Sequence, residues 1–238
     1  QIYEQEKEWR QAIEVAKLLA TAEDSYERAI SHYYCELAEE QLSLGQIELA
    51  RESLREAIGH DVNNPRTSLV RGRIDVLEGH YDNAIAALTR IRDQDPVFVP
   101  ESLETLEEVY KHRSQLEYQE YLKSCLEVTP SISIVLTLAK SIREAEGDEA
   151  VAKFIASHLK KNPTIRGLTK LIDLHIDNTR GIAKENLAIL RSFAEALVAD
   201  KPAYRCHSCG FDGKRMHWQC PVCHDWASIK PIFGLEGE

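Results

Sequence analysis

The chain has 238 residues, of which 43% are hydrophobic, 29% are charged and 7% are aromatic, so it can bury a core as one large domain or two small ones. Its formal net charge is −10, and the segment from Lys201 onward is nearly neutral because five Lys and Arg meet four Asp and Glu. The acidic excess therefore precedes Lys201. It would repel a phosphate backbone, which argues against a dedicated nucleic-acid binder. No apolar run is long enough to span a bilayer.

Helix-forming residues dominate from Gln1 to about Ala199, which predicts an all-α architecture for this part of the chain. The sequence begins without Met, in the middle of a helical pattern. We therefore expect a fragment from which an N-terminal part, including any membrane anchor, has been left out. The stretch 8–13 is typical of the second helix of a repeat whose first helix is missing.

Glycines recur at a fixed spacing along this helical part. Gly45 and Gly79 lie 34 residues apart, Gly147 and Gly181 lie 34 residues apart, and Arg113 occupies the midway position. A period of this length is typical of a solenoid built from helix pairs, in which each pair buries one apolar stripe internally and another against its neighbour.

Small residues accompany this period at positions where two helices would touch. They are Gly72, Ala50, Ala84 and Ala57. Together with the spacing, they resemble the tetratricopeptide repeat, a helix–turn–helix unit. The resemblance implies a superhelical array that binds proteins along its concave face.

The period and the prolines divide the chain into helix pairs. We expect these pairs at about residues 26–60, 65–94, 100–128 and 131–161, with a degenerate final pair at 164–177 and 182–199. The third pair matches less well because Arg113 and Tyr118 replace the usual Gly and Ala. The last helix would cap the array or carry the segment that follows.

Pro202 ends the helical part, and Tyr204 opens a different module with almost no linker. We therefore predict two domains, a repeat array over residues 1–200 and a small module over 201–238. A freely swinging module would need a long Gly- and Ser-rich tether. We expect this one to pack against the helices.

The small module contains two C-x-x-C pairs separated by ten residues: Cys206, Cys209, Cys220 and Cys223. This pattern suits a tetrahedral metal ion bound by four thiolates, with each pair on one tight turn. The alternative is two reduced pairs or two disulfides. A long acidic chain with no secretory signal is not typical of a disulfide framework.

The cysteine turns resemble the two knuckles of rubredoxin, C-x-x-C-G and C-P-x-C, over about Tyr204–Trp226. Gly210 allows the positive φ that closes the first turn, and Pro221 stiffens the second. The ten intervening residues are fewer than an electron-transfer rubredoxin carries, which puts such a role in doubt. Four thiolates suit zinc and iron about equally, so the pattern leaves the metal open.

Other side chains in the module have plainer interpretations. The histidines that could replace a ligand, interpreted here as surface residues, are His207, His217 and His224. The aromatic residues expected to form a miniature core are Phe211, Trp218 and Trp226. Two isolated helical cysteines, Cys35 and Cys125, are expected to be buried and unreactive.

No catalytic constellation stands out: the sequence has no phosphate-binding Gly-rich loop, no G-x-S-x-G and no H-E-x-x-H. We therefore predict a protein that is not an enzyme. The inner helices of the repeats would line a groove for an extended or helical peptide. The candidate groove residues are Glu39, Leu42, Arg73, Val76, Glu107 and Tyr110.

A tetratricopeptide array that runs directly into a shortened rubredoxin-like module resembles the lipopolysaccharide assembly protein B family of Gram-negative bacteria. The resemblance implies an adaptor anchored to the cytoplasmic side of the inner membrane by an N-terminal helix. Such an adaptor helps the membrane protease FtsH degrade the deacetylase that commits lipid A synthesis, and an inner-membrane partner restrains it. The metal ligands carry over to Cys206, Cys209, Cys220 and Cys223.

Two other functions stay open at this point. A rubredoxin-like redox or iron-sensing protein on a repeat scaffold is the first. A zinc-ribbon nucleic-acid module is the second, resting only on Arg205, Lys214, Arg215 and nearby histidines, and the acidic array opposes it. A homo-oligomer is also possible.

Overall fold

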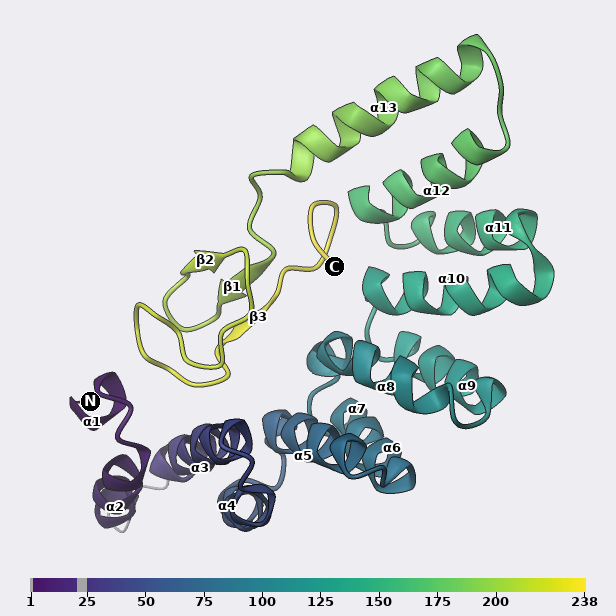
Figure 1. Ribbon diagram of the computed structural model, residues 1–238. Coiled ribbons are helices and arrows are strands. Elements are labelled where there is room, and N and C mark those ends of the chain that lie inside the picture. Colours follow the sequence, from purple (N-terminus) through teal and green to yellow (C-terminus); the bar gives the residue numbers. More distant parts are fainter. Residues whose placement is uncertain (1, 21–24) are drawn as a thin grey trace. The chain divides into compact units, whose positions relative to one another are not determined.

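The computed structural model describes residues 2–20 and 25–238. It comprises two compact units, one ending at Ser114 and the other running from Gln115 to Glu238 (Figure 1). Both units are built mainly from antiparallel helix pairs, as the composition predicts. In the described residues, no helix combines the length and the apolar composition needed to cross a membrane.

The first unit consists of helices. They are α1 (Ile2–Gln5), α2 (Trp9–Ala20), α3 (Ser25–Ser43), α4 (Ile47–His60), α5 (Pro65–Leu77), α6 (Tyr81–Thr89), α7 (Ile91–Gln94), the 3₁₀ helix η1 (Pro96–Ser102) and α8 (Leu103–Tyr110).

The second unit contains five helices and a small sheet. These elements are α9 (Gln115–Leu126), α10 (Ile132–Glu146), α11 (Asp148–Leu159), α12 (Ile165–Asp177), α13 (Ile182–Val198), β1 (Tyr204–Cys206), β2 (Asp212–Gly213) and β3 (Ile229–Pro231). The structure has helices at each of the expected positions, and the pairs expected within one unit are confirmed with ends that differ by only a few residues. The pair expected at about residues 100–128 is divided between the units, with α8 in the first and α9 in the second.

The periodic glycines lie in the turns between the two helices of a pair. Gly45, Gly79, Gly147 and Gly181 all have positive φ, between 67° and 84°. This left-handed conformation is costly for residues that carry a Cβ, so glycine at this position lets the chain reverse directly after the first helix. The period in the sequence is therefore a period of turns.

Arg113 marks the turn where the period loses its glycine. Its backbone does not adopt positive φ, since the only described non-glycine residues that do are Lys7, His224 and Ala227. The Arg113 guanidinium instead lies 2.7 Å from the Asp82 carboxylate. Nearby, the rings of Tyr81 and His112 stack with centroids 4.7 Å apart. Side-chain contacts hold this turn in place of the glycine conformation.

Helix starts are fixed by capping side chains. Asn64 accepts a hydrogen bond from Arg66 N, with Pro65 at the first helical position of α5. Ser131 accepts from Ile134 N at the start of α10, and Thr164 accepts from Gly167 N at the start of α12. These caps satisfy backbone donors that have no partner inside the helix.

Small residues allow close helix contacts, as predicted. A Cβ added at Gly72 of α5 would lie 2.5 Å from Leu88 of α6. Ala50, Ala57 and Ala84 are fully buried, so the positions inferred from the period do belong to the helix contacts.

The last helix, α13, buries little of its apolar surface. Ala194 is its one buried residue, and Arg191 pairs with Asp173 of α12 at 2.5 Å. Its large apolar side chains Ile182 and Phe193 are 76% and 65% exposed. One face of α13 therefore packs on α12, while a second apolar face remains open.

Candidate metal centre

The residues after α13 form a three-stranded antiparallel ribbon with strand order β2-β1-β3. Tyr204 pairs with both Gly213 and Pro231, and Cys206 pairs with Ile229. Arg205 and Asp212 lie opposite each other on β1 and β2, and their side chains form an ion pair at 2.6 Å. The strands are only two or three residues long, so they bury too little apolar surface to form a stable fold by themselves.

The ribbon brings together all four cysteines of the predicted ligand set. The Sγ atoms of Cys206 and Cys223 are 3.7 Å apart, and those of Cys209 and Cys220 are 3.6 Å apart. All four sulfurs lie within 4.8 Å of one another. A tetrahedron with metal–sulfur bonds of about 2.3 Å has edges of roughly 3.8 Å, so the arrangement fits one tetrahedral metal ion.

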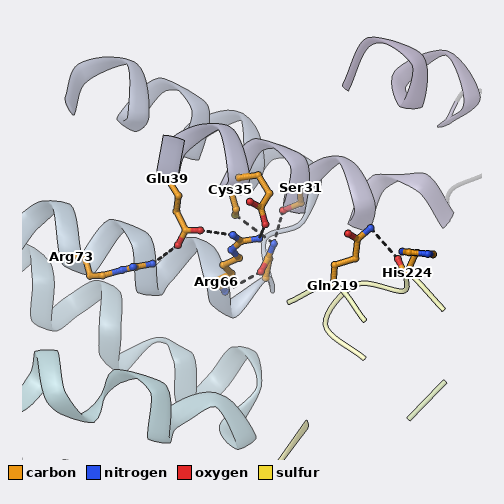
Figure 2. Close-up of polar contacts among 9 residues, drawn as sticks. Ser31, Cys35, Glu39, Arg66, Arg73, Gln219 and His224 are labelled. Carbon is orange, nitrogen blue, oxygen red and sulfur yellow. Dashed lines mark hydrogen bonds and ion pairs between the residues drawn. The ribbon is translucent and has the colours of Figure 1, made fainter. Parts of the chain in front are cut away.

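Each C-x-x-C pair sits on a turn of the same shape. In the first, Gly210 N donates to Cys206 O at 2.9 Å, and in the second, His224 N donates to Cys220 O at 3.0 Å. Gly210 has φ 78° as predicted, and His224 has φ 60°. The second turn therefore uses a histidine where the first uses a glycine. Gln219 Nε2, 3.4 Å from His224 O, donates to this turn (Figure 2).

Three of the four ligand thiols have a perturbed pKa: that of Cys206 is lowered, and those of Cys209 and Cys223 are raised. Burial would raise the pKa of Cys206, but hydrogen bonds with the Ser228 hydroxyl and with the backbone N–H groups of Cys209 and Ser208 lower it to about 6. A lowered pKa favours the thiolate, which is the form that binds metal. Cys206 and Cys220 are buried, whereas Cys209 and Cys223 are exposed.

Most of the remaining side chains of the module lie as the plainer interpretation predicts, whereas Trp218 is half-buried and lies outside the small core. His207, His217 and His224 are exposed. Among the described residues, the group of potential metal ligands at this site consists of the four cysteines and includes no His, Asp or Glu. Trp226 is 4% exposed, and Ile229 forms a small core with Cys206 and Cys220, against which Phe211 packs. Cys35 and Cys125 on the helices are fully buried, and burial raises the pKa of Cys35 to about 12.

The segment after β3 attaches the ribbon to the helices. The Glu238 carboxylate accepts hydrogen bonds from Ser131 Oγ at 2.7 Å, from Ser133 N at 3.1 Å and from Ser133 Oγ at 2.5 Å. Arg166 of α12 lies 2.6 Å from the same carboxylate. One acidic side chain thus joins the N-terminal ends of α10 and α12, which sequence reasoning did not identify.

Backbone contacts extend this attachment. Ile165 N, at the start of α12, donates to Leu235 O at 2.8 Å. A side chain adds a further contact: Lys214 Nζ donates to Ala199 O at 3.0 Å, at the C-terminal end of α13, where a cation is favoured by the helix dipole. The prediction that the module packs against the helices is confirmed within this unit.

The predicted groove residues of the first unit have different outcomes. Glu39 of α3 is held by Arg66 and, at 2.5 Å, by Arg73 (Figure 2). Arg66 is almost fully buried and also pairs with Glu36 at 2.8 Å. Tyr110, by contrast, is only 4% exposed, so its assignment to an open groove is wrong: it is part of the core.

A second set of potential ligands lies at the turn between α5 and α6. Asp75, Glu78 and His80 place one ligand atom each within 4.8 Å of the others. The Arg51 guanidinium already contacts both carboxylates, Asp75 at 2.6 Å and Glu78 more closely. Arg51, rather than a metal ion, therefore supplies the positive charge that these carboxylates need, and we interpret the cluster as an ion-pair network.

Helix pairs at a 34-residue spacing, followed by a four-cysteine ribbon docked on the last of them, define a tetratricopeptide-type repeat protein with a rubredoxin-like module. Residues 204–231 match the family described as rubredoxin metal binding domain.

Over its whole length the chain is 36% identical to lipopolysaccharide assembly protein B of Escherichia coli K12 and covers 62% of that protein. It is 28% identical over 99% of its length to lipopolysaccharide assembly protein B of Haemophilus influenzae, covering 60% of that protein. The chain is thus homologous to lipopolysaccharide assembly protein B, as its motifs indicate, and spans about three fifths of the length of these relatives. A solved structure of pilF from Pseudomonas aeruginosa aligns with 84% of this chain and 88% of its own, at 17% identity and a TM-score of 0.46.

Proposed function

We propose that this chain is a non-enzymatic adaptor in lipopolysaccharide assembly, acting on the cytoplasmic side of the inner membrane. The observation that carries the proposal is the homology to lipopolysaccharide assembly protein B along the entire chain. In this proposal, the repeats bind the membrane protease FtsH and the deacetylase that commits lipid A synthesis, so that the deacetylase is degraded. An inner-membrane partner regulates this activity through a membrane segment.

The ion-pair network between α3 and α5 gives the proposed groove a defined polar surface. The buried Arg66 forms an ion pair with Glu39 on the protein side. Arg73, whose side chain is 49% exposed, forms a second ion pair with the same carboxylate on the solvent side. Burial would raise the pKa of Glu39, but the charges of Arg66 and Arg73 lower it, so this carboxylate stays ionised at neutral pH. Fixed charges of both signs give specificity in peptide recognition.

We further propose that Cys206, Cys209, Cys220 and Cys223 hold one zinc or iron ion with a structural role. Bound metal would supply the folding free energy that the short strands lack. The ribbon then positions Glu238 and Leu235 on the N-terminal ends of α10 and α12. In this account the metal determines the shape of the last helix pairs, which the array presents to its partners.

Direct binding tests the adaptor proposal. Metal-loaded chain is immobilised, and purified deacetylase and FtsH are passed over it separately. We expect at least one of them to bind, and we expect Arg73→Glu to weaken binding at least tenfold, because it places a like charge beside Glu39. Arg55→Glu is the matched control, since Arg55 is exposed on α4 and has no carboxylate partner among the described residues. If neither protein binds fully metallated chain, the proposal is wrong.

The rubredoxin-type match and the exposure of Cys209 and Cys223 favour a redox or iron-sensing role as the second candidate. Voltammetry of the iron-loaded chain distinguishes a redox or iron-sensing role from a purely structural role of the metal. A reversible one-electron couple that changes partner binding would support the redox role. Equal partner binding by the zinc and iron forms would support a structural metal.

A further inference from the structure

A cavity of about 120 Å³ lies among α4, α5 and α6, within the first unit. Its polar wall consists of Arg71, Thr67 and Ser68 from α5, Asn83 from α6, and Arg90 from the turn between α6 and α7. Its apolar wall is formed by Ile58 of α4 and two alanines of α6. None of the described residues that line it is acidic, although the chain as a whole carries a net charge of −10.

Arg90 carries a positive charge that no carboxylate of the described residues 2–20 and 25–238 neutralises. Its Nη2 donates to Val62 O at 3.1 Å, which orients the guanidinium. Among the described residues, no Asp or Glu lies within ion-pairing distance of Arg90. Its remaining N–H groups are available to a ligand in the cavity.

Arg71 is only loosely paired. Its Nε lies 3.7 Å from Asp75 Oδ2, while the other oxygen of Asp75 is bonded to Arg51 at 2.6 Å. One carboxylate therefore serves two guanidinium groups. The Arg71 side chain is 49% exposed, so a solute can reach it.

Neutral donors complete the cavity. Ser68 offers a hydroxyl and Asn83 an amide, both from the first turns of their helices, where the helix dipole favours an anion. The volume corresponds to about four water molecules, which leaves room for a tetrahedral oxyanion. Arginine pairs from two sides are suited to phosphate.

We propose that this cavity binds a phosphate group, either free phosphate or the phosphomonoester of a larger molecule. The site is separate from the four cysteines and from the ion-pair network of α3 and α5. It would add a small anionic ligand to a protein whose proposed role is binding other proteins.

The test is calorimetric titration of the full metal-loaded chain with inorganic phosphate at constant ionic strength. We expect saturable binding that each of Arg71→Gln and Arg90→Gln weakens about tenfold or more, since each removes a charge-assisted contact. Arg55→Gln removes the same charge from α4 outside the cavity and should bind like wild type. Arg90→Gln decides the matter if Arg71→Gln destabilises the chain through Asp75. Equal binding by Arg90→Gln and Arg55→Gln, or no saturable binding by wild type, overturns the proposal.

Two further arms identify the carrier of the phosphate. Titration with glycerol 3-phosphate tests a soluble phosphomonoester, and sedimentation with phosphatidylcholine vesicles containing phosphatidic acid tests a lipid headgroup. Binding in either arm that is lost in Arg90→Gln supports the proposal and assigns the carrier. Binding in neither arm, together with no phosphate binding, contradicts it.

Discussion

Replacing Glu238 with Gln keeps the shape of the side chain and removes its charge. In the structure this carboxylate accepts from Ser131 Oγ, Ser133 N and Ser133 Oγ and pairs with Arg166, and its side chain is only 13% exposed. The amide retains one acceptor oxygen and directs an NH₂ group at groups that themselves donate. The substitution should therefore loosen the contact between the ribbon and the N-terminal ends of α10 and α12.

The magnitude follows from the contacts that are lost. A charge-assisted hydrogen bond contributes about 1.5–3 kcal/mol. The pair with half-exposed Arg166 adds about 1 kcal/mol or less because solvent screens it. Some of the hydrogen bonds survive in weaker form, so we expect a loss of about 2 kcal/mol in the free energy of unfolding. For a unit of this size that corresponds to a fall of about 6–10 °C in Tm.

The effect should depend on pH with a definite sign. Burial would raise the pKa of Glu238, but the hydrogen bonds from Ser133 and Ser131 and the charge of Arg166 lower it. A carboxyl group whose pKa is lower in the folded state stabilises fully above its unfolded pKa, about 4.3 for Glu. The difference between wild type and Glu238→Gln should be complete at pH 7 and decrease as the pH falls below this value.

Calorimetry of metal-loaded protein measures this difference. Glu236→Gln is the matched control in the same segment, because Lys201 is its one ion-pair partner among the described residues, and both side chains are about half exposed. We expect the control to change Tm by less than 2 °C, as for an exposed ion pair. Equal Tm values for the two variants at pH 7 would refute the assignment of Glu238 as the main contact.

Three further predictions concern positions with a special backbone conformation or a close helix contact. Gly72→Ala should destabilise the first unit by about 1–2 kcal/mol in urea unfolding. The added Cβ would lie 2.5 Å from the Leu88 side chain, and the cost of this overpacking exceeds the gain in helix propensity. An unchanged or higher urea midpoint of unfolding would show that Leu88 can move aside. Gly210→Ala should weaken metal retention against a chelator, since φ 78° costs a residue with a Cβ about 1–2 kcal/mol. His224→Gly, at φ 60° in the matching turn, should retain metal as well as wild type or better, and a loss equal to that of Gly210→Ala would contradict the equivalence of the two turns.

The helix pairs were predictable from sequence because their cause is local. A glycine with positive φ follows the first helix of these pairs, and the spacing of these glycines can be counted in the sequence: Gly45, Gly79, Gly147 and Gly181. Gly72 was predictable for a similar reason, because only glycine permits the close approach of Leu88. Where the sequence lacks the glycine, at Arg113, the turn depends on a contact with Asp82, 31 residues away, which no local pattern reveals.

The ligand set of the candidate site was also visible, since two C-x-x-C pairs specify both the residue type and the turn. The structural equivalence of His224 and Gly210, which occupy the same position in the two cysteine turns, was not predictable from the sequence, because the positive φ of a histidine is seen only in the backbone of the structure. Glu238 was missed for a different reason. Its partners Ser131 and Ser133 lie more than one hundred residues away in sequence, and the short segment after β3 has no distinguishing pattern.

The exposed apolar face of α13 was also not predictable from the sequence. Ile182 and Phe193 have the spacing of an apolar stripe, and the sequence suggests that this helix caps the array. Both stripes of α13 are apolar, however, and periodicity does not determine which stripe faces α12. Only the packing shows that these residues are exposed.

We propose that metal bound by the four cysteines fixes the ribbon on the ends of α10 and α12. Two backbone amides report on this contact directly. Ser133 N and Ile165 N lie in first turns, where no intrahelical partner is available, and they donate instead to Glu238 and Leu235. Their hydrogen exchange therefore measures whether the ribbon is docked.

The measurement compares metal content and amide exchange in wild type and in the Cys206→Ser/Cys209→Ser variant. We expect one metal ion per wild-type chain with both amides protected, and no bound metal with rapid exchange at both amides in the variant. Metal loss with unchanged protection of Ser133 and Ile165 would contradict the account, because the ribbon would then stay docked without its metal.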